Sequence, residues 1–306
     1  MIKTFVINVS LFGLLCLVSF VFVYFLADGS TDANYLRFTT GKQSSLVIGG
    51  SRAAQGIQPY VINRNLNNVK MYNYAFQNPS SPYGEIYLNS IKRKIRRGND
   101  IGVFILEVNP WNLMNYRSRK SLQEANSFIA KTTFVNFKPN FEYLIESFAE
   151  RNLSILENKI RKGNNMTYYL NEDGWLEVTL DEPNEMVKLH RKKHKIEKYK
   201  SRINDSEGLS SYRLQFLDST IAYLKSFGEV YLVRMPVSVE MQENEKKLCP
   251  DFDKVMDSIS LKSKSIYYNF LINGDENSDF TDGHHLDKES GACFTLQLLD
   301  SIKTRL

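Results

Sequence analysis

Apolar residues recur along the chain in short runs that alternate with longer amphipathic stretches. Five runs rich in β-branched and aromatic residues predict strands buried on both faces, at 44–49, 69–75, 101–108, 229–235 and 266–271. The stretches between and after them carry apolar residues at helical spacing, or are of helical length, which predicts helices at 53–65, 83–97, 212–227, 252–261 and 291–306. Strands that alternate with helices indicate an α/β fold with a parallel sheet.

The pattern changes between residues 112 and 211, which we interpret as a mostly helical insertion or cap on the α/β core. Helices are expected at 118–129 and 140–161, and an Asp-Gly turn within 171–180 predicts a small exposed hairpin. Residues 188–202 are strongly basic with little apolar periodicity. Such a run is commonly a solvated face, and the alternative is a surface that binds lipid headgroups or a polyanion.

The first apolar run, residues 5–26, is much longer than the others. About 22 residues suffice to cross a bilayer as a helix, whereas the apolar core of a signal peptide spans ~7–15. We therefore expect an uncleaved anchor over 1–27, a polar stalk over 28–43 and the α/β domain over 44–306. Lys3 precedes the run and Asp28 and Asp32 follow it, which predicts a cytoplasmic N-terminus with the domain outside.

Composition adds few constraints on function. The net charge of +5 over 306 residues is mild and gives no reason to expect a nucleic-acid partner. Cys16 lies in the apolar run, while Cys249 and Cys293 would either pair in an oxidising compartment or remain separate thiols. Cysteine spacing typical of a metal site is absent from the sequence, and we expect no cofactor.

The candidate chemistry centres on residues 46–59, which read LVIGGSRAAQGIQP. This pattern predicts a buried strand, a glycine turn and a helix, with Ser51 at the turn. Near the other end of the chain, Asp282 and His285 fall on one loop. A serine, a histidine and an aspartate are the parts of a nucleophile, its base and the group that orients the base, and His284 is a competing base. The paired histidines, with Asp282 and Asp287, also allow a metal site.

Four further residues are candidates for contacts around Ser51. Asn78 and Asn109 follow the second and third strands, at the sheet edge where α/β proteins bind ligands, and could donate to an oxyanion. Ordinary turn hydrogen bonds are the alternative for both. Arg52 and Arg234 are candidate substrate contacts, and the alternative for each is an ion pair.

Taken together, Gly-Gly-Ser-Arg after the first strand, Asn78, Asn109 and a C-terminal Asp-x-x-His resemble the SGNH/GDSL hydrolase superfamily. The likeness is greatest to its membrane-anchored bacterial branch, which includes the D-alanyl transfer protein of teichoic acid modification and alginate acetylation proteins. Gly50 stands where the superfamily has the aspartate of its Gly-Asp-Ser block. Its later glycine and Gly-x-Asn-Asp blocks are not literally present.

This resemblance implies a three-layer flavodoxin-like domain that transfers or hydrolyses an acyl ester through an acyl-serine, with Ser51, His285 and Asp282 as the triad. It also implies a bacterial cytoplasmic-membrane protein whose domain is periplasmic or extracellular. The acceptor would be a cell-envelope or secreted glycan, and a multi-span membrane acyltransferase would be a partner. The alternatives are an esterase that needs no partner and a catalytically idle scaffold that binds a glycan or such an acyltransferase.

Overall fold

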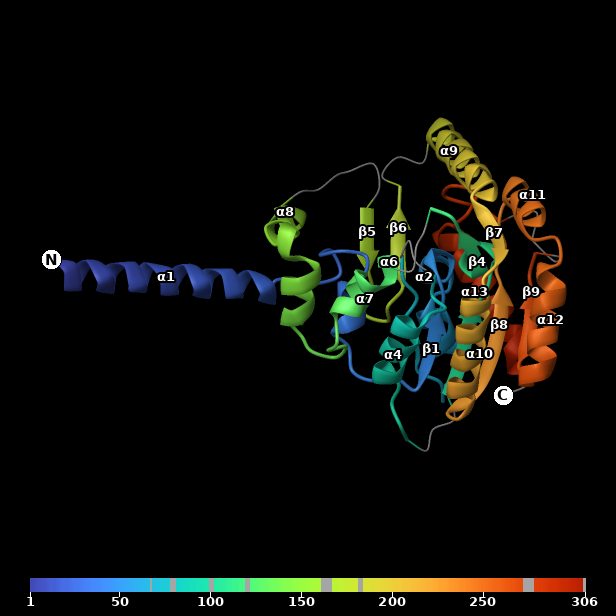
Figure 1. The fold of residues 1–306 in the computed structure, drawn as a ribbon, viewed down its shortest axis with the longest axis horizontal. Coiled ribbons are helices and arrows are strands. Elements are labelled where there is room, and N and C mark those ends of the chain that lie inside the picture. Colours follow the sequence, from blue (N-terminus) through green and yellow to red (C-terminus); the bar gives the residue numbers. More distant parts are fainter. Residues whose placement is uncertain are drawn as a thin grey trace.

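The five apolar runs pair as one parallel sheet at the centre of the protein (Figure 1). Its spatial order is β2-β1-β3-β8-β9, formed by Met71–Asn73, Ser45–Ile48, Gly102–Glu107, Gly228–Arg234 and Ile266–Asn269. The register places Leu46 opposite Phe104, and Phe104 opposite Val230. The predicted α/β class and parallel sheet are therefore confirmed. The computed structural model describes residues 1–66, 68–77, 81–98, 102–118, 122–160, 167–180, 184–271 and 278–304.

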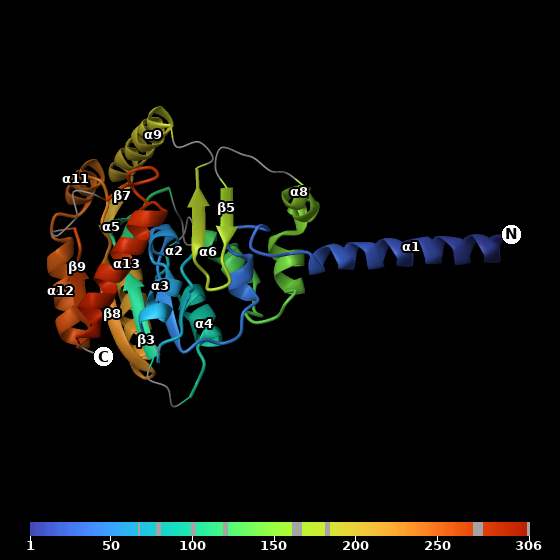
Figure 2. The same cartoon turned by 180° about the vertical axis from the view of Figure 1, so that it is seen from behind.

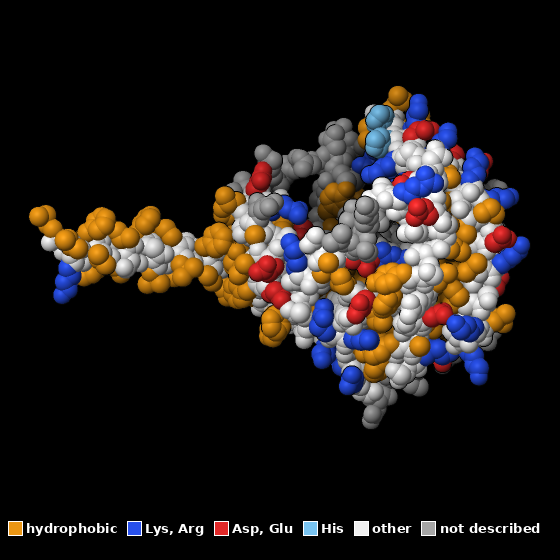
Figure 3. Space-filling view, in the orientation of Figure 1, with side chains coloured by type: hydrophobic (Ala, Val, Ile, Leu, Met, Phe, Trp, Pro, Cys, Tyr) orange, Lys and Arg blue, Asp and Glu red, His pale blue; other side chains and the backbone are white. Residues whose placement is uncertain are grey.

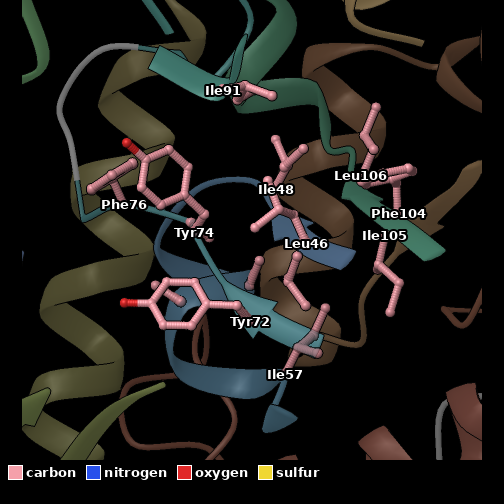
Figure 4. Close-up of a cluster of buried hydrophobic side chains, with 14 of the residues drawn as sticks. Leu46, Ile48, Ile57, Tyr72, Tyr74, Phe76, Ile91, Phe104, Ile105 and Leu106 are labelled. Carbon is pink, nitrogen blue, oxygen red and sulfur yellow. The ribbon is translucent and has the colours of Figure 1, made fainter. Parts of the chain in front are cut away.

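Helices cover both faces of this sheet. On one face lie α4 (Glu85–Lys94) and α10 (Ser211–Lys225), and on the other lie α3 (Pro59–Asn65) and α13 (Lys288–Lys303), as Figures 1 and 2 show. The helix α12 (Phe252–Ser263) packs at the β9 edge. Figure 4 shows the core that results, in which side chains of β1, β2 and β3 meet Tyr74, Phe76 and Ile91. Burying each large apolar side chain contributes roughly 1.5–3 kcal/mol.

Several predicted helices differ from the observed ones in their bounds, and two of the differences have a clear local cause. The helix expected over 53–65 is two helices, α2 (Ser51–Gly56) and α3, because Ile57 and Gln58 are extended and Pro59 starts a new helix. A residue before proline is driven away from helical backbone, which explains the break. The last helix begins before residue 291, since the Asp287 carboxylate caps it by accepting from Ser290 N–H at 2.8 Å. A further helix, α11 (Val239–Leu248), was not predicted.

The N-terminal apolar run forms α1 (Ile2–Phe25), which projects from one end of the body (Figures 1 and 2). It is long and apolar enough to cross a membrane. The residues after it do not form the expected stalk. Tyr35–Phe38 is a buried 3-10 helix, and the Arg37 guanidinium donates to the carbonyls of Asn73 and Gly174 inside the body. Buried hydrogen bonds of this kind replace the solvent contacts that a stalk would have.

The region 112–211 is built from many short elements and one long helix, α9 (Glu185–Ile203). The described ones are α5 (Pro110–Leu113), β4 (Met114–Tyr116), α6 (Leu122–Ala125), α7 (Phe128–Lys131), a π-helix (Tyr143–Ser147), a 3-10 helix (Ala149–Arg151), α8 (Ser154–Ile160), β5 (Thr167–Leu170), β6 (Leu176–Thr179), α9 (Glu185–Ile203) and β7 (Ser206–Leu209). The long helices expected at 118–129 and 140–161 were wrong. In the second segment the backbone leaves the helical region at Phe148, and the first residues are held by a distant part of the chain, since Asn140 Nδ2 donates to the Phe38 carbonyl at 2.9 Å.

The expected hairpin exists as β5 and β6, which pair antiparallel. Its Asp-Gly turn places Gly174 at φ +83°, a left-handed conformation that favours glycine. The hairpin is exposed only in part, because Tyr168 and Tyr169 are exposed whereas Trp175 is buried and its indole N–H donates to the Gln55 carbonyl at 2.6 Å. The cysteines Cys16, Cys249 and Cys293 are free thiols, so the pairing considered for the last two is not formed.

Candidate active site

Ser51 occupies the tight turn between β1 and α2, as the sequence predicts. A side chain at Gly49 would place its Cβ 2.7 Å from the Glu107 Cβ and 2.9 Å from the Ala53 Cβ, so only glycine fits there. Gly50 is extended and Ser51 is the first residue of α2. A first-turn N–H has no partner within its own helix, which leaves the Ser51 N–H free to bond another group.

Asp282 organises the loop that follows β9. Its Oδ1 accepts from the backbone N–H groups of His284 and His285 at 3.0 and 3.1 Å. Gly283, which follows Asp282 directly, is at φ +75°, and its carbonyl accepts from Ser238 N–H at 3.0 Å, which ties the loop to the start of α11. The loop therefore has a fixed conformation before any contact with Ser51 is considered.

Ser51, His285 and Asp282 lie in a continuous hydrogen-bonded row, although 234 residues separate the first two along the chain. The Nε2 atom of His285 is 2.8 Å from Ser51 Oγ, and its Nδ1 is 3.0 Å from each carboxylate oxygen of Asp282. A carboxylate accepts only, so Nδ1 carries a proton and the neutral ring presents its Nε2 lone pair to the serine hydroxyl. In this arrangement Ser51 O–H donates to a base.

The charges around this row favour an ionised Asp282 and a neutral His285. Burial acts to raise the pKa of Asp282, but His285 and then Lys195 outweigh it and hold the pKa of this carboxyl below its usual range. Burial also lowers the pKa of His285, and the nearby Asp282 offsets this effect only in part. A neutral imidazole beside a serine can accept a proton near neutral pH.

His284, the competing base, contacts other partners. Its Nδ1 lies 3.0 Å from Arg52 Nη2, and its Nε2 lies 3.1 Å from the Tyr199 hydroxyl. Because a guanidinium only donates, Nδ1 accepts, and burial together with Arg52 holds the pKa of His284 well below its usual value. Within the described ranges, no group of three or more His, Cys, Asp or Glu side chains is arranged to hold a metal ion.

Arg52 and Arg234 share the buried carboxylate of Glu245. Arg52 Nη2 is 2.5 Å from Glu245 Oε1, and Arg234 Nη2 is 2.9 Å from Glu245 Oε2. Arg234 also pairs with Asp253 at 2.6 Å, and Trp111 Nε1 donates to Glu245 at 2.9 Å. Both arginines thus form the ion pairs considered as the alternative to substrate contacts. One nitrogen of each arginine, Arg52 Nη1 and Arg234 Nε, has no hydrogen-bond partner in the described part of the chain, so a substrate contact stays a prediction for both residues.

Asn109 uses its side chain within its own turn. Its Oδ1 caps α5 by accepting from Asn112 N–H at 3.1 Å, and its Nδ2 donates to the Glu107 carboxylate. In the structure the Asn109 side chain therefore forms the ordinary turn hydrogen bonds that were the alternative to an oxyanion contact. Asn78, the other predicted donor, lies outside the described residues.

Three charged residues near the row were not predicted. Glu107 is fully buried and accepts from Gly50 N–H at 3.0 Å, and burial raises the pKa of its carboxyl. Glu107 is the one acidic residue in the apolar run 101–108, and this contrast could have singled it out in the sequence. Glu245 lies in a polar stretch that gives no such signal.

Lys195, on α9, is the third charged residue missed, and its Nζ is 3.0 Å from Asp282 Oδ2. Tyr199, one turn further along α9, contacts His284. The basic run 188–202 is thus more than a solvated face, because one lysine of it reaches the Asp282 carboxylate.

Neither protein-family models nor curated proteins give a match to this chain. A functional assignment therefore depends on the geometry of Ser51, His285 and Asp282 and on the charges that surround them.

Proposed function

We propose that the protein is a membrane-anchored serine esterase or acyl-ester transferase that works through an acyl-serine at Ser51. The observation that carries the proposal is the row of Ser51 Oγ, His285 Nε2 and Nδ1, and Asp282, with spacings of 2.8 and 3.0 Å. An unactivated serine hydroxyl is a poor nucleophile, and a hydrogen-bonded imidazole oriented by a carboxylate is the standard means of activating it.

In the proposed reaction, Ser51 Oγ bonds to the acyl carbon of an ester while its proton moves to His285 Nε2. Asp282 stabilises the imidazolium that forms, and the Ser51 N–H donates to the negative carbonyl oxygen. The bond between the acyl carbon and the leaving alcohol then breaks, and the alcohol takes the proton from Nε2. Water or an acceptor hydroxyl next gives its proton to Nε2 while its oxygen bonds to the acyl carbon. The bond from that carbon to Ser51 Oγ then breaks, and Nε2 returns the proton to Oγ, which releases the acid or the new ester and restores Ser51.

The finer assignment, to an SGNH-like domain of flavodoxin type, is part of the same proposal. Numbered along the chain, the sheet order is 2-1-3-4-5, which is also the order in flavodoxin-like sheets. Ser51 follows the first strand, at the carboxyl edge where such sheets bind ligands. A cell-envelope or secreted glycan as acceptor, and a multi-span acyltransferase as partner, follow from the resemblance and from the anchor α1.

A serine-reactive fluorophosphonate tests the proposal on the full chain in detergent. An activated serine displaces fluoride and keeps the phosphonyl group, so we expect one labelled peptide, containing Ser51. Labelling should be lost in Ser51→Ala and His285→Ala. Ser44→Ala is the matched control, because Ser44 precedes the opposite end of the same strand and should leave labelling unchanged. A folded native chain that takes no label would overturn the proposal and favour a non-catalytic scaffold.

A further inference from the structure

Large apolar side chains are exposed at the end of the body from which α1 leaves. They are Phe134 at 54%, Phe137 at 57%, Phe141 at 40%, Ile145 at 50% and Leu153 at 72% exposed. Figure 3 shows apolar side chains gathered around this junction, continuous with those of α1. An exposed apolar surface beside a candidate membrane span calls for a partner that removes it from water.

The position of these residues relative to α1 is set by direct contacts. The Phe141 ring lies 6.0 Å from the rings of both Tyr24 and Phe25 in the last turn of α1. Tyr24 is itself buried in the body, and Asp28 just beyond the helix pairs with Lys159 of α8. The end of α1 and the surface that carries Phe141 therefore form one packed unit.

The length of α1 places this unit at the edge of a bilayer. A helix of 24 residues is about 36 Å long at about 1.5 Å per residue, slightly more than the ~30 Å hydrocarbon core. When α1 spans that core, Phe25 lies at the interface, and Phe141 must lie at nearly the same depth. Phenylalanine and leucine side chains at this depth can bury their apolar surface at the boundary between headgroups and acyl chains, as they do on amphipathic interfacial helices.

The loop that carries Phe134 and Phe137 is held in place by polar contacts on its inner side. Asn140 Nδ2 donates to the carbonyls of Phe38 and Phe134 at 2.9 and 2.6 Å. The Phe134 N–H also donates to the Glu142 carboxylate at 2.7 Å. The rings of Phe134 and Phe137 pack on each other at 5.3 Å and face outward together. The backbone is thus fixed while the apolar side chains point away from the core.

We propose that Phe134, Phe137, Phe141, Ile145 and Leu153 form a membrane-contacting collar that inserts into the headgroup region of the bilayer spanned by α1. The collar goes beyond the proposed chemistry at Ser51 and rests on α1 being embedded in lipid. Its consequence is that the body is held at a defined orientation to the membrane, by a surface in addition to a single helix.

Tryptophan quenching by brominated lipids tests the collar. The full chain carrying Phe137→Trp is reconstituted into vesicles of phosphatidylglycerol and phosphatidylcholine with acyl chains brominated near the headgroups. Both native tryptophans, Trp111 and Trp175, are buried and serve as background. The matched control is Leu261→Trp, at a position 81% exposed on α12, far from α1 in Figure 1. Bromine in both leaflets makes the result independent of vesicle orientation.

We expect the emission added by Phe137→Trp to shift to the blue and to lose its larger part to brominated lipid, while that of Leu261→Trp does neither. Equal, weak quenching of the two variants in vesicles that carry the protein would overturn the collar, and would also be the result if this face bound a protein partner instead. Failure of the chain to float with the vesicles would overturn the anchor and the collar together. Fluorophosphonate labelling of Ser51 is read separately in detergent, so neither result bears on it.

Discussion

The carboxylate of Asp282 offers the sharpest test of how the site works. Asp282 accepts from two backbone N–H groups, His285 Nδ1–H and Lys195 Nζ, so each of its contacts is with a donor. In Asp282→Asn, one oxygen can keep the backbone bonds, but the new NH₂ group must face a donor. His285 relieves this clash by moving its proton from Nδ1 to Nε2. A protonated Nε2 can no longer accept the proton of Ser51.

The expected loss follows from that change of tautomer. The same substitution in a Ser-His-Asp triad lowers turnover on the order of 10⁴-fold, about 5.4 kcal/mol of transition-state stabilisation. The assay is hydrolysis of an aryl acetate by the full chain in detergent, with thermal unfolding measured on the same samples. Asp287→Asn is the matched control, because asparagine caps a helix as well as aspartate does and activity should persist. A folded Asp282→Asn chain within tenfold of native activity would refute the mechanism.

Two further predictions concern the charges around the site. In Lys195→Met, the loss of a cation near His285 should raise the pKa of the imidazole. Activity requires the neutral imidazole and falls as pH drops through that pKa. The acidic limb of the pH–rate profile should therefore move to higher pH. Lys198→Met, at an exposed position on the same helix, should leave the profile in place. Glu245→Gln removes the buried charge shared by Arg52 and Arg234 and should cost about 3–5 kcal/mol in denaturant unfolding. The exposed Glu243→Gln should change stability by less than about 0.5 kcal/mol, and similar values for the two variants would contradict this account.

The pattern of apolar residues predicted the structure correctly where a whole segment lies in one environment, such as the buried interior. The runs of the inner strands β1 and β3 are apolar because both faces of these strands are covered, so their pattern alone indicates a parallel sheet, whereas the edge strand β9 is only half-buried. The position of Ser51 could be predicted because two glycines end an apolar run. The loop of Asp282 and His285 was predicted from spacing, since a carboxylate three residues before a histidine can reach it locally.

The same reasoning failed where a segment is shaped by remote contacts. Residues 28–43 look solvent-facing, yet the Arg37 guanidinium is buried because carbonyls from β2 and the β5–β6 turn converge on it. The segment expected to be one helix over 140–161 is likewise held by distant residues, since Asn140 Nδ2 donates to the Phe38 carbonyl and the Tyr143 hydroxyl donates to the Asp32 carboxylate.

The sequence by itself was enough to predict the strands of the sheet, the apolar span, and Ser51, His285 and Asp282 as the candidate site residues. Each of these follows from residues that are close together along the chain. Only the tertiary structure decided that His285 rather than His284 faces Ser51, that Lys195 pairs with Asp282, and that Glu245 joins two arginines. These contacts join segments that are distant in sequence, and burial gives them their strength, since a charge removed from water must find its partner within the fold.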